Sequence, residues 1–210
     1  MEISPFSTLV VRPWQLWLGC ALVGGASAAL WTSRAPAHGS DALDAARRTY
    51  VAMDPPRPLG AVALLDHRGE AFDAARLRGH FSLVFLGYTR CPDVCPTTLS
   101  VLAPVLDRLP EDAQVIFVSV DPEHDDVARM GEYVSAFHPR LVGVTGERAA
   151  LESFTAALGG RMAVGEGTRL DHPTSLFVVD DRARVVATLL RPSSPSRVLR
   201  ELARARRESR

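Results

Sequence analysis

The segment Phe85-Leu86-Gly87-Tyr88-Thr89-Arg90-Cys91-Pro92-Asp93-Val94-Cys95-Pro96 joins the end of one element to the start of the next. It overlaps a continuous apolar run, Ser82–Gly87, which is typical of a strand buried on both faces. A short loop then carries Cys91, and Cys95 with Pro96 opens a helix. A proline is favourable in a first helical turn, because its missing N–H would be unpaired there in any case. The segment therefore predicts two thiols at a strand-to-helix junction.

On both sides of this segment, apolar runs typical of strands alternate with helical spacing of leucine and valine. Strands are predicted at 61–65, 70–72, 82–87, 114–120, 141–144, 176–179 and 184–190, and helices at 96–109, 125–137, 147–158 and 195–206. Strands that alternate with helices, followed by a terminal hairpin and helix, predict an α/β domain with a central mixed sheet flanked by helices. We assign this domain to residues 60–210.

An apolar stretch near the start of the chain predicts membrane insertion. Trp14–Trp31 contains no charge, is just long enough to cross ~30 Å of hydrocarbon as a helix, and has a tryptophan at each end. Arg12 precedes it, as expected on the cytoplasmic side, so residues 1–13 are predicted to be a short cytoplasmic segment. We expect 14–31 to be an export signal that is retained as a transmembrane anchor.

Two features of the following residues qualify that assignment. Ala26-Ser27-Ala28 and Ala35-Pro36-Ala37 both have the small-x-small form that signal peptidase reads, so cleavage stays open. Residues 32–59 are rich in alanine, proline, aspartate and arginine, and they are predicted to be a linker.

The composition excludes several chemistries. All 24 basic residues are arginine, so no lysine is present to form a Schiff base, anchor PLP or contact a phosphate in a Walker motif. The formal net charge of zero gives no electrostatic footprint for nucleic acid. Three cysteines are too few for a disulfide scaffold, and Cys20 lies inside the predicted membrane helix.

The remaining two cysteines are placed for thiolate chemistry. Thiols four residues apart at a helix start face one another, where unpaired N–H groups and the helix dipole stabilise a thiolate. Arg90 is expected to add a neighbouring positive charge. Two adjacent thiolates serve either reversible disulfide formation or joint ligation of a soft metal such as Cu(I). A static disulfide or a buried structural thiol pair is the alternative.

A third ligand is expected to come from a histidine. His172 lies in Leu170-Asp171-His172-Pro173-Thr174, immediately before the strand 176–179. In a thioredoxin-like topology the loop before that strand packs beside the redox cysteines, and Asp171 would orient the imidazole. The other histidines are expected to be loop or structural residues: His38, His67, His80, His124 and His138. For His124, helix capping explains the acidic cluster 121–126 about as well as a metal would.

The order of several motifs resembles the Sco/SenC copper-chaperone family. They are Gly87–Thr97 with its two cysteines, Phe117–Pro122, Phe137–Arg140, Val144–Gly146 and Asp171-His172, within a match that runs from about residue 60 to 190. The resemblance implies a thioredoxin-like, membrane-anchored protein that binds copper, as Cu(I) or Cu(II), through Cys91, Cys95 and His172.

The resemblance also implies a function and partners. Family members support assembly of the dinuclear copper centre of cytochrome c oxidase, as copper donors to its copper-receiving subunit, as thiol reductants of its cysteines, or as both. Other periplasmic copper chaperones or thiol reductants are further expected partners. Thirteen residues ahead of the predicted helix leave no room for an Arg-rich transit peptide. We therefore expect a bacterial inner membrane, with the soluble domain in the periplasm.

Two positions depart from the family pattern. Pro173 follows the ligand histidine where a small residue such as serine is usual, and Pro173-Thr174 is similar to the cis-Pro-Thr of thioredoxins. This keeps a thiol-disulfide reductase open as the alternative function, with Cys91 as the attacking thiol. His124 stands where arginine is more usual, which we interpret as a neutral surface change. Thr89 and Asp93 are expected to be solvated loop residues, and Tyr88 a packing residue.

Overall fold

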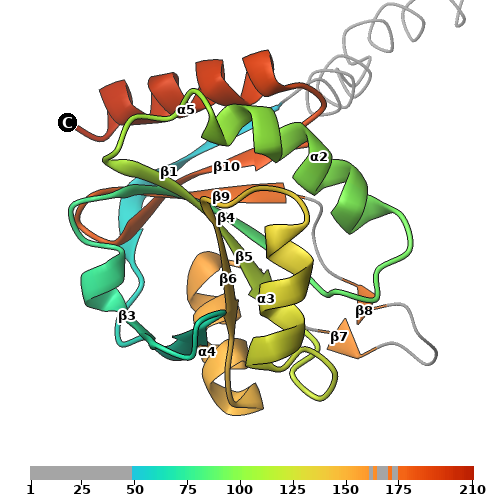
Figure 1. The fold of residues 1–210 in the computed structure, drawn as a ribbon. Coiled ribbons are helices and arrows are strands. Elements are labelled where there is room, and N and C mark those ends of the chain that lie inside the picture. The colour runs from blue at the N-terminus through green and yellow to red at the C-terminus, as the bar shows by residue number, and fades with distance from the viewer. Residues whose placement is uncertain (1–48, 161–162, 165–169, 172–174) are drawn as a thin grey trace, which may run out of the picture. The chain divides into compact units, whose positions relative to one another are not determined.

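The computed structural model describes residues 49–160, 163–164, 170–171 and 175–210. An eight-stranded mixed sheet in the order β1-β10-β9-β4-β5-β6-β2-β3 forms its centre (Figure 1). The strands are β1 (Tyr50–Pro58), β2 (Ala63–Asp66), β3 (Ala71–Asp73), β4 (Phe81–Gly87), β5 (Ala113–Ser119), β6 (Leu141–Thr145), β9 (Ser175–Val179) and β10 (Arg184–Leu190), and a separate pair is formed by β7 (Ala163–Val164) and β8 (Leu170–Asp171). The helices are α2 (Val94–Leu106), α3 (Val127–Ser135), α4 (Arg148–Leu158) and α5 (Pro195–Glu208), with a single 3-10 turn, η1, at Ala74–Arg76.

Three parallel strands form the middle of the sheet and explain its continuous apolar runs. β4 pairs in parallel with β5, and β5 with β6, while β9 runs antiparallel on the other side of β4. All seven residues of β4 are buried. Successive side chains point to opposite faces, so Leu83 and Phe85 enter one apolar cluster and Val84 and Leu86 enter the other.

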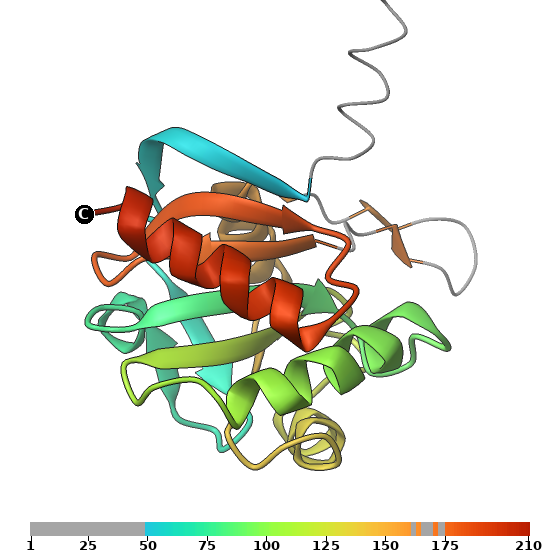
Figure 2. The same ribbon diagram turned by 90° about the horizontal axis from the view of Figure 1, so that it is seen from above.

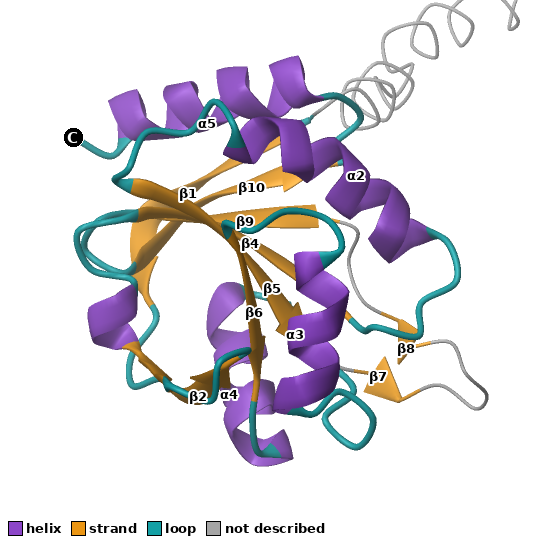
Figure 3. Ribbon diagram, viewed as in Figure 1, coloured by secondary structure: helices purple, strands orange, loops and turns teal. Residues whose placement is uncertain are grey.

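Helices cover both faces of this sheet and give it three layers (Figures 2 and 3). The cluster beneath α2, α3 and α5 contains buried residues of all three helices, among them Leu99, Met130 and Leu202. The opposite cluster contains Leu151 and Phe154 of α4. α2 and α5 lie side by side on one face, as Figure 2 shows. The expected α/β domain with a central mixed sheet flanked by helices is confirmed.

The N-terminal boundary of the domain differs from the expected one. Residues 50–58, within the predicted linker 32–59, form strand β1, which pairs antiparallel with β10. The prolines of this segment suggested a linker, but a strand at the edge of a sheet accommodates residues that lack an N–H. The pairing is irregular between Ala52 and Arg57, where those prolines lie. The ordered unit therefore includes residues ahead of Gly60.

The predicted membrane segment 14–31 lies outside the described residues, as do residues 1–13. Within the part of the chain that the structure describes, no helix has the length and apolar character needed to cross a membrane.

Candidate metal and thiol site

The end of β4 brings the two cysteines together. β4 stops at Gly87, and a Cβ atom at this position would lie 2.4 Å from Cε2 of Phe117 and 2.8 Å from Sγ of Cys95. Glycine is therefore required for the start of α2 to pack this closely against β4 and β5. The chain then turns, with the Cys91 N–H donating to the Tyr88 carbonyl at 3.2 Å, before α2 begins at Val94.

The two thiols differ in their exposure. Cys95 is completely buried in the cluster beneath α2, whereas Cys91 is partly exposed and packs against both apolar clusters. The backbone N–H of Cys95 donates to Sγ of Cys91 at 3.4 Å. Both cysteines are free thiols in this structure, so the predicted juxtaposition is found without a disulfide.

The two thiols differ in pKa because their surroundings differ. Partial burial raises the pKa of Cys91, but N–H groups of Cys95, Asp93 and Val94 and the Cys95 thiol outweigh it and hold that pKa below its ordinary value. Burial raises the pKa of Cys95 far above its ordinary value, and the hydrogen bond and charge of Cys91 raise it further. Cys91 is thus the more acidic thiol of the pair, and Cys95 is the thiol that donates to it.

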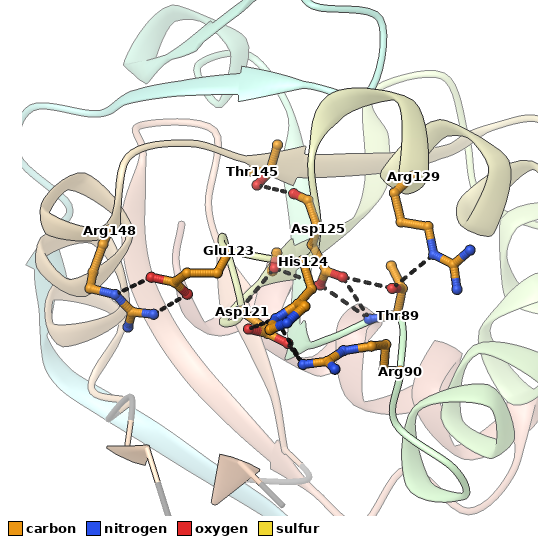
Figure 4. Close-up of polar contacts among 10 residues, drawn as sticks. Thr89, Arg90, Asp121, Glu123, His124, Asp125, Arg129, Thr145 and Arg148 are labelled. Atoms are coloured by element: carbon orange, nitrogen blue, oxygen red, sulfur yellow. Dashed lines mark hydrogen bonds and ion pairs between the residues drawn. The ribbon is translucent and has the colours of Figure 1, made fainter. Parts of the chain in front are cut away.

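A buried carboxylate holds the loop that precedes Cys91 (Figure 4). Asp125 is completely buried and accepts a hydrogen bond of 2.6 Å from the Thr89 hydroxyl, as well as the Thr89 N–H at 3.1 Å. The Ser119 hydroxyl at the end of β5 donates to the same carboxylate at 2.7 Å. Thr89 was expected to be solvated, but it is 7% exposed, because Asp125 provides an acceptor for both of its donors.

A second, more exposed group of charges lies beside this carboxylate. The guanidinium of Arg90 donates to Asp121 at 2.8 Å, and the His124 ring contacts the same carboxylate at 2.9 Å (Figure 4). Burial raises the pKa of Asp121, but the Arg90 and His124 contacts outweigh it and leave that pKa below its ordinary value. Glu123 forms a bidentate ion pair with Arg148 of α4.

These contacts bear on two expectations. His124 is an exposed surface residue, as expected, and its ring contacts Asp121 and Arg90. Helix capping accounts for Asp126 in the cluster 121–126, because this residue accepts the Arg129 N–H at 2.7 Å at the start of α3. Arg90 was expected to supply positive charge to Cys91, but its guanidinium pairs with Asp121, and the groups that lower the Cys91 pKa are N–H donors and a thiol.

The expected third ligand, His172, lies outside the described residues, as do Pro173 and Thr174. The chain is described again from Ser175, where β9 begins, and Leu176 of β9 pairs with Phe85 of β4. β9 thus begins beside the end of β4, from which the cysteine loop leaves. Among the described residues, no three or more His, Cys, Asp or Glu side chains are grouped to hold a metal ion.

Sequence reasoning missed Asp125 and Thr89 as parts of the site. Asp125 stands next to a genuine capping aspartate, and nothing in the local pattern distinguishes the two. Its partner Thr89 is 36 residues away, so the pairing depends on the parallel register that places the ends of β4 and β5 side by side.

The chain matches a known protein family. A family model described as SCO1/SenC matches residues 54–207. The chain is 46% identical over 92 residues to the mitochondrial SCO2 homolog of Mus musculus, a match that covers 41% of this chain and 36% of that protein. It is 29% identical over 149 residues to an SCO2-like protein of Rickettsia conorii. This match covers 67% of this chain and 73% of that protein. The match thus spans little more than a third of the length of the mouse relative.

A solved structure shares the fold. The crystal structure of Arabidopsis thaliana ScoI with copper bound superposes with a TM-score of 0.66 at 27% identity, covering 71% of this chain and 98% of that one. The α/β domain is accordingly thioredoxin-like. Because the family model spans most of the chain, including both cysteines and the whole Asp125 network, the chain belongs to the SCO1/SenC family.

Proposed function

We propose that this chain is a membrane-anchored copper metallochaperone that supports assembly of the dinuclear copper centre of cytochrome c oxidase. Cys91, Cys95 and His172 are its proposed copper ligands. The observation that carries the proposal is the pair of adjacent sulfurs at the start of α2, one of them already favoured as a thiolate. The related Arabidopsis ScoI structure, which contains copper, supports the choice of metal.

The donor set fits copper. Two thiolates suit Cu(I), and an imidazole extends the site to Cu(II). Cys91 supplies a sulfur that is ionised more readily than an ordinary thiol, whereas Cys95 releases a proton when the metal binds. His172 is favoured as the third ligand because it stands three residues ahead of β9 in the sequence, and β9 begins beside the end of β4.

Transfer to a partner would proceed by ligand exchange. The more exposed Cys91 is the sulfur that an incoming thiolate reaches first, so we propose that it leaves the metal before the buried Cys95. The copper-receiving subunit of the oxidase is the proposed partner, with other periplasmic copper chaperones or thiol reductants as further partners. We also propose that residues 14–31 anchor the protein in a bacterial inner membrane, with 1–13 in the cytoplasm and the domain in the periplasm.

A copper titration of the reduced full chain tests the proposal. We expect one copper per chain in the wild type, loss of binding in Cys91→Ser and in Cys95→Ser, and weaker binding in His172→Ala. Cys20→Ser is the matched control, because it removes the third cysteine of the chain and should leave the stoichiometry unchanged. Absence of stoichiometric binding to the wild type would refute copper carriage.

A thiol-disulfide reductase is the second candidate, favoured by the difference between the two thiols. Cys91 thiolate would attack a partner disulfide and release one partner thiolate; Cys95 would then attack Cys91 and release the second, leaving a Cys91–Cys95 disulfide. The targets would be the cysteines of the oxidase copper site or of other exported proteins. His172→Ala separates the candidates, because reduction of a model disulfide should survive it while copper binding weakens.

A further inference from the structure

The outward side of α5 carries positive charge without acidic neighbours. The helix is amphipathic, and Arg200 and Arg207 lie exposed, about two turns apart, on the side opposite its buried residues. Ser196 and Ala203, which are exposed on the same side, are small and uncharged. We call Arg200 and Arg207 the outward arginines. The buried residues that define the inner side are Val198, Leu202 and Ala205.

Two other arginines of α5 are paired within the domain. Arg204 pairs with Glu208 at 2.8 Å, and Arg206 pairs with Asp112 ahead of β5. The outward arginines, by contrast, form no ion pair with any residue that the structure describes. Their charge is therefore available to a partner outside the domain.

The neighbouring helix adds no opposing charge to this face. α2 lies beside α5 on the same side of the sheet, and its sequence contains no charged residue (Figure 2). Its exposed residues include Thr97, Ser100 and Pro104, while the nearest acidic residues in the chain, Asp93 and Asp107, stand just before and just after the helix. The face formed by α2 and α5 is thus neutral on one helix and positive on the other, which complements an anionic surface.

The chain enters the domain beside α5. The Thr49 hydroxyl donates to Glu201 at 3.5 Å, and the Tyr50 hydroxyl at the start of β1 donates to Glu208 at 2.7 Å. If residues 14–31 anchor the chain as proposed, residues 32–48 let the domain move at most about 60 Å from the membrane. Such confinement makes a weak attraction between the domain and the membrane effective.

We propose that the outward arginines bind the phosphate groups of anionic lipids in the membrane that anchors the chain. Guanidinium groups bind phosphate in a bidentate manner, and the small residues beside them allow the helix to approach the headgroups closely. Because α2 begins at the cysteine pair and lies beside α5, this contact keeps Cys91 near the membrane surface. The inference rests on the proposed membrane anchor and is independent of copper binding.

Modification of arginine by phenylglyoxal, measured residue by residue with mass spectrometry, tests the inference on the full chain in lipid nanodiscs. One set of discs contains phosphatidylcholine alone, and the other contains about one-third phosphatidylglycerol. We expect Arg200 to react several times more slowly in the anionic discs. The two rates should become equal in about 1 M NaCl, which screens charges beyond a few ångströms.

Variants of Arg207 separate charge from packing. Arg207→Gln should weaken the lipid contact about fivefold, the effect of one basic residue near an anionic membrane, and Arg200 should then react faster in the anionic discs. Arg207→Lys keeps the charge, so most of the protection of Arg200 should remain. Equal loss of protection in both variants would contradict binding through charge.

Arg68 is the internal control, and Arg68→Gln is the matched variant. Arg68 is exposed in the turn between β2 and β3, at the opposite edge of the sheet from β1. Its rate of modification should be the same in both discs, and Arg68→Gln should leave Arg200 protected.

Three results would overturn the inference. Arg200 might react equally fast in both discs, which would leave the proposed function standing. Arg200 protected equally in both discs would mean that protein, rather than anionic lipid, covers this face. A chain that inserts into neither disc would overturn the proposed anchor together with the inference.

Discussion

Buried aspartates accept the hydrogen bonds that stabilise two kinds of region in this protein, the hairpin turns and the cysteine loop. Asp66, in the turn between β2 and β3, accepts the N–H groups of Arg68 and Glu70 at 2.9 and 3.0 Å. Asp180, in the turn between β9 and β10, accepts the Arg184 N–H at 2.9 Å and also pairs with the Arg184 guanidinium. In both turns a carboxylate is satisfied mainly by N–H groups a few residues further along the chain.

Most hydrogen-bond donors to Asp125 come from residues that are distant in the chain. Its carboxylate accepts donors from the loop after β4 and from the end of β5, and its backbone carbonyl accepts the Thr145 hydroxyl of β6 at 2.6 Å (Figure 4). One residue thus connects the ends of three adjacent parallel strands, directly beneath the segment that leads to Cys91. The hairpin aspartates stabilise single turns, whereas Asp125 ties the shape of the site to the register of the sheet.

The largest effect should follow removal of Asp125. Asp125→Ala leaves the two donors of Thr89 and the hydroxyl of Ser119 buried without an acceptor, so we expect the free energy of unfolding to fall by about 3 kcal/mol or more. Urea denaturation of the metal-free protein measures this loss. Asp126→Ala is the neighbouring control, because it removes only a helix cap, at a cost of about 1 kcal/mol. Equal losses in the two variants would contradict the assignment of Asp125 as the connecting residue.

A smaller loss should follow from Gly87→Ala. The added methyl would overlap Phe117 and the Cys95 sulfur, and we expect overpacking of this kind to cost about 2 kcal/mol. Because the clash falls on Cys95, the Cys91–Cys95 disulfide should also form at a different rate when the reduced variant is titrated with an oxidant. Thermal unfolding and thiol counting measure the two effects. An unchanged melting temperature would mean that β4 and α2 separate more easily than their packing indicates.

The same comparison explains what could be predicted from the sequence. The turn at Asp66 was found because glycine and the charged residues stand next to one another in the chain, and the buried strands were found from unbroken apolar runs. The cysteine pair was found because its spacing is also local. Asp125 was missed because its role depends on donors that only the folded sheet brings close. Strand β1 was missed because its prolines suggested a linker, although an edge strand tolerates them.

The Asp66 turn should show a modest effect that depends on pH. Burial raises the pKa of Asp66, but the N–H groups of Arg68 and Glu70 and the charge of Arg76 outweigh it and hold that pKa below its ordinary value. A lowered carboxyl pKa contributes stability above the unfolded-state pKa, and this contribution is lost as the pH falls through the folded-state pKa. We therefore expect Asp66→Asn to cost about 1 kcal/mol at pH 7.

Urea denaturation at a series of pH values measures this difference. The difference in free energy of unfolding between wild type and Asp66→Asn should become smaller below about pH 4, where the carboxylate of the unfolded wild type takes up its proton. Copper retention at pH 7 should be the same in both proteins, because this turn lies apart from the cysteines. A gap that widens in acid would contradict the assignment of Asp66 as a stabilising carboxylate.

The last prediction concerns Cys91. Like the hairpin carboxylates and unlike Asp125, its sulfur accepts hydrogen bonds from residues that are close to it in the chain. Its N–H donors are Asp93, Val94 and Cys95, two to four residues further along the chain, and they lower its pKa against the opposing effect of burial. We expect alkylation of Cys91 by iodoacetamide to reach half its maximal rate at a pH below the ~8.5 of a free thiol. Cys95→Ala should move that midpoint upward only in part, because it removes the thiol donor but keeps the N–H groups. If the midpoint instead rises to that of a free thiol, the N–H groups of the turn contribute nothing, and the neighbouring cysteine alone lowers the pKa of Cys91.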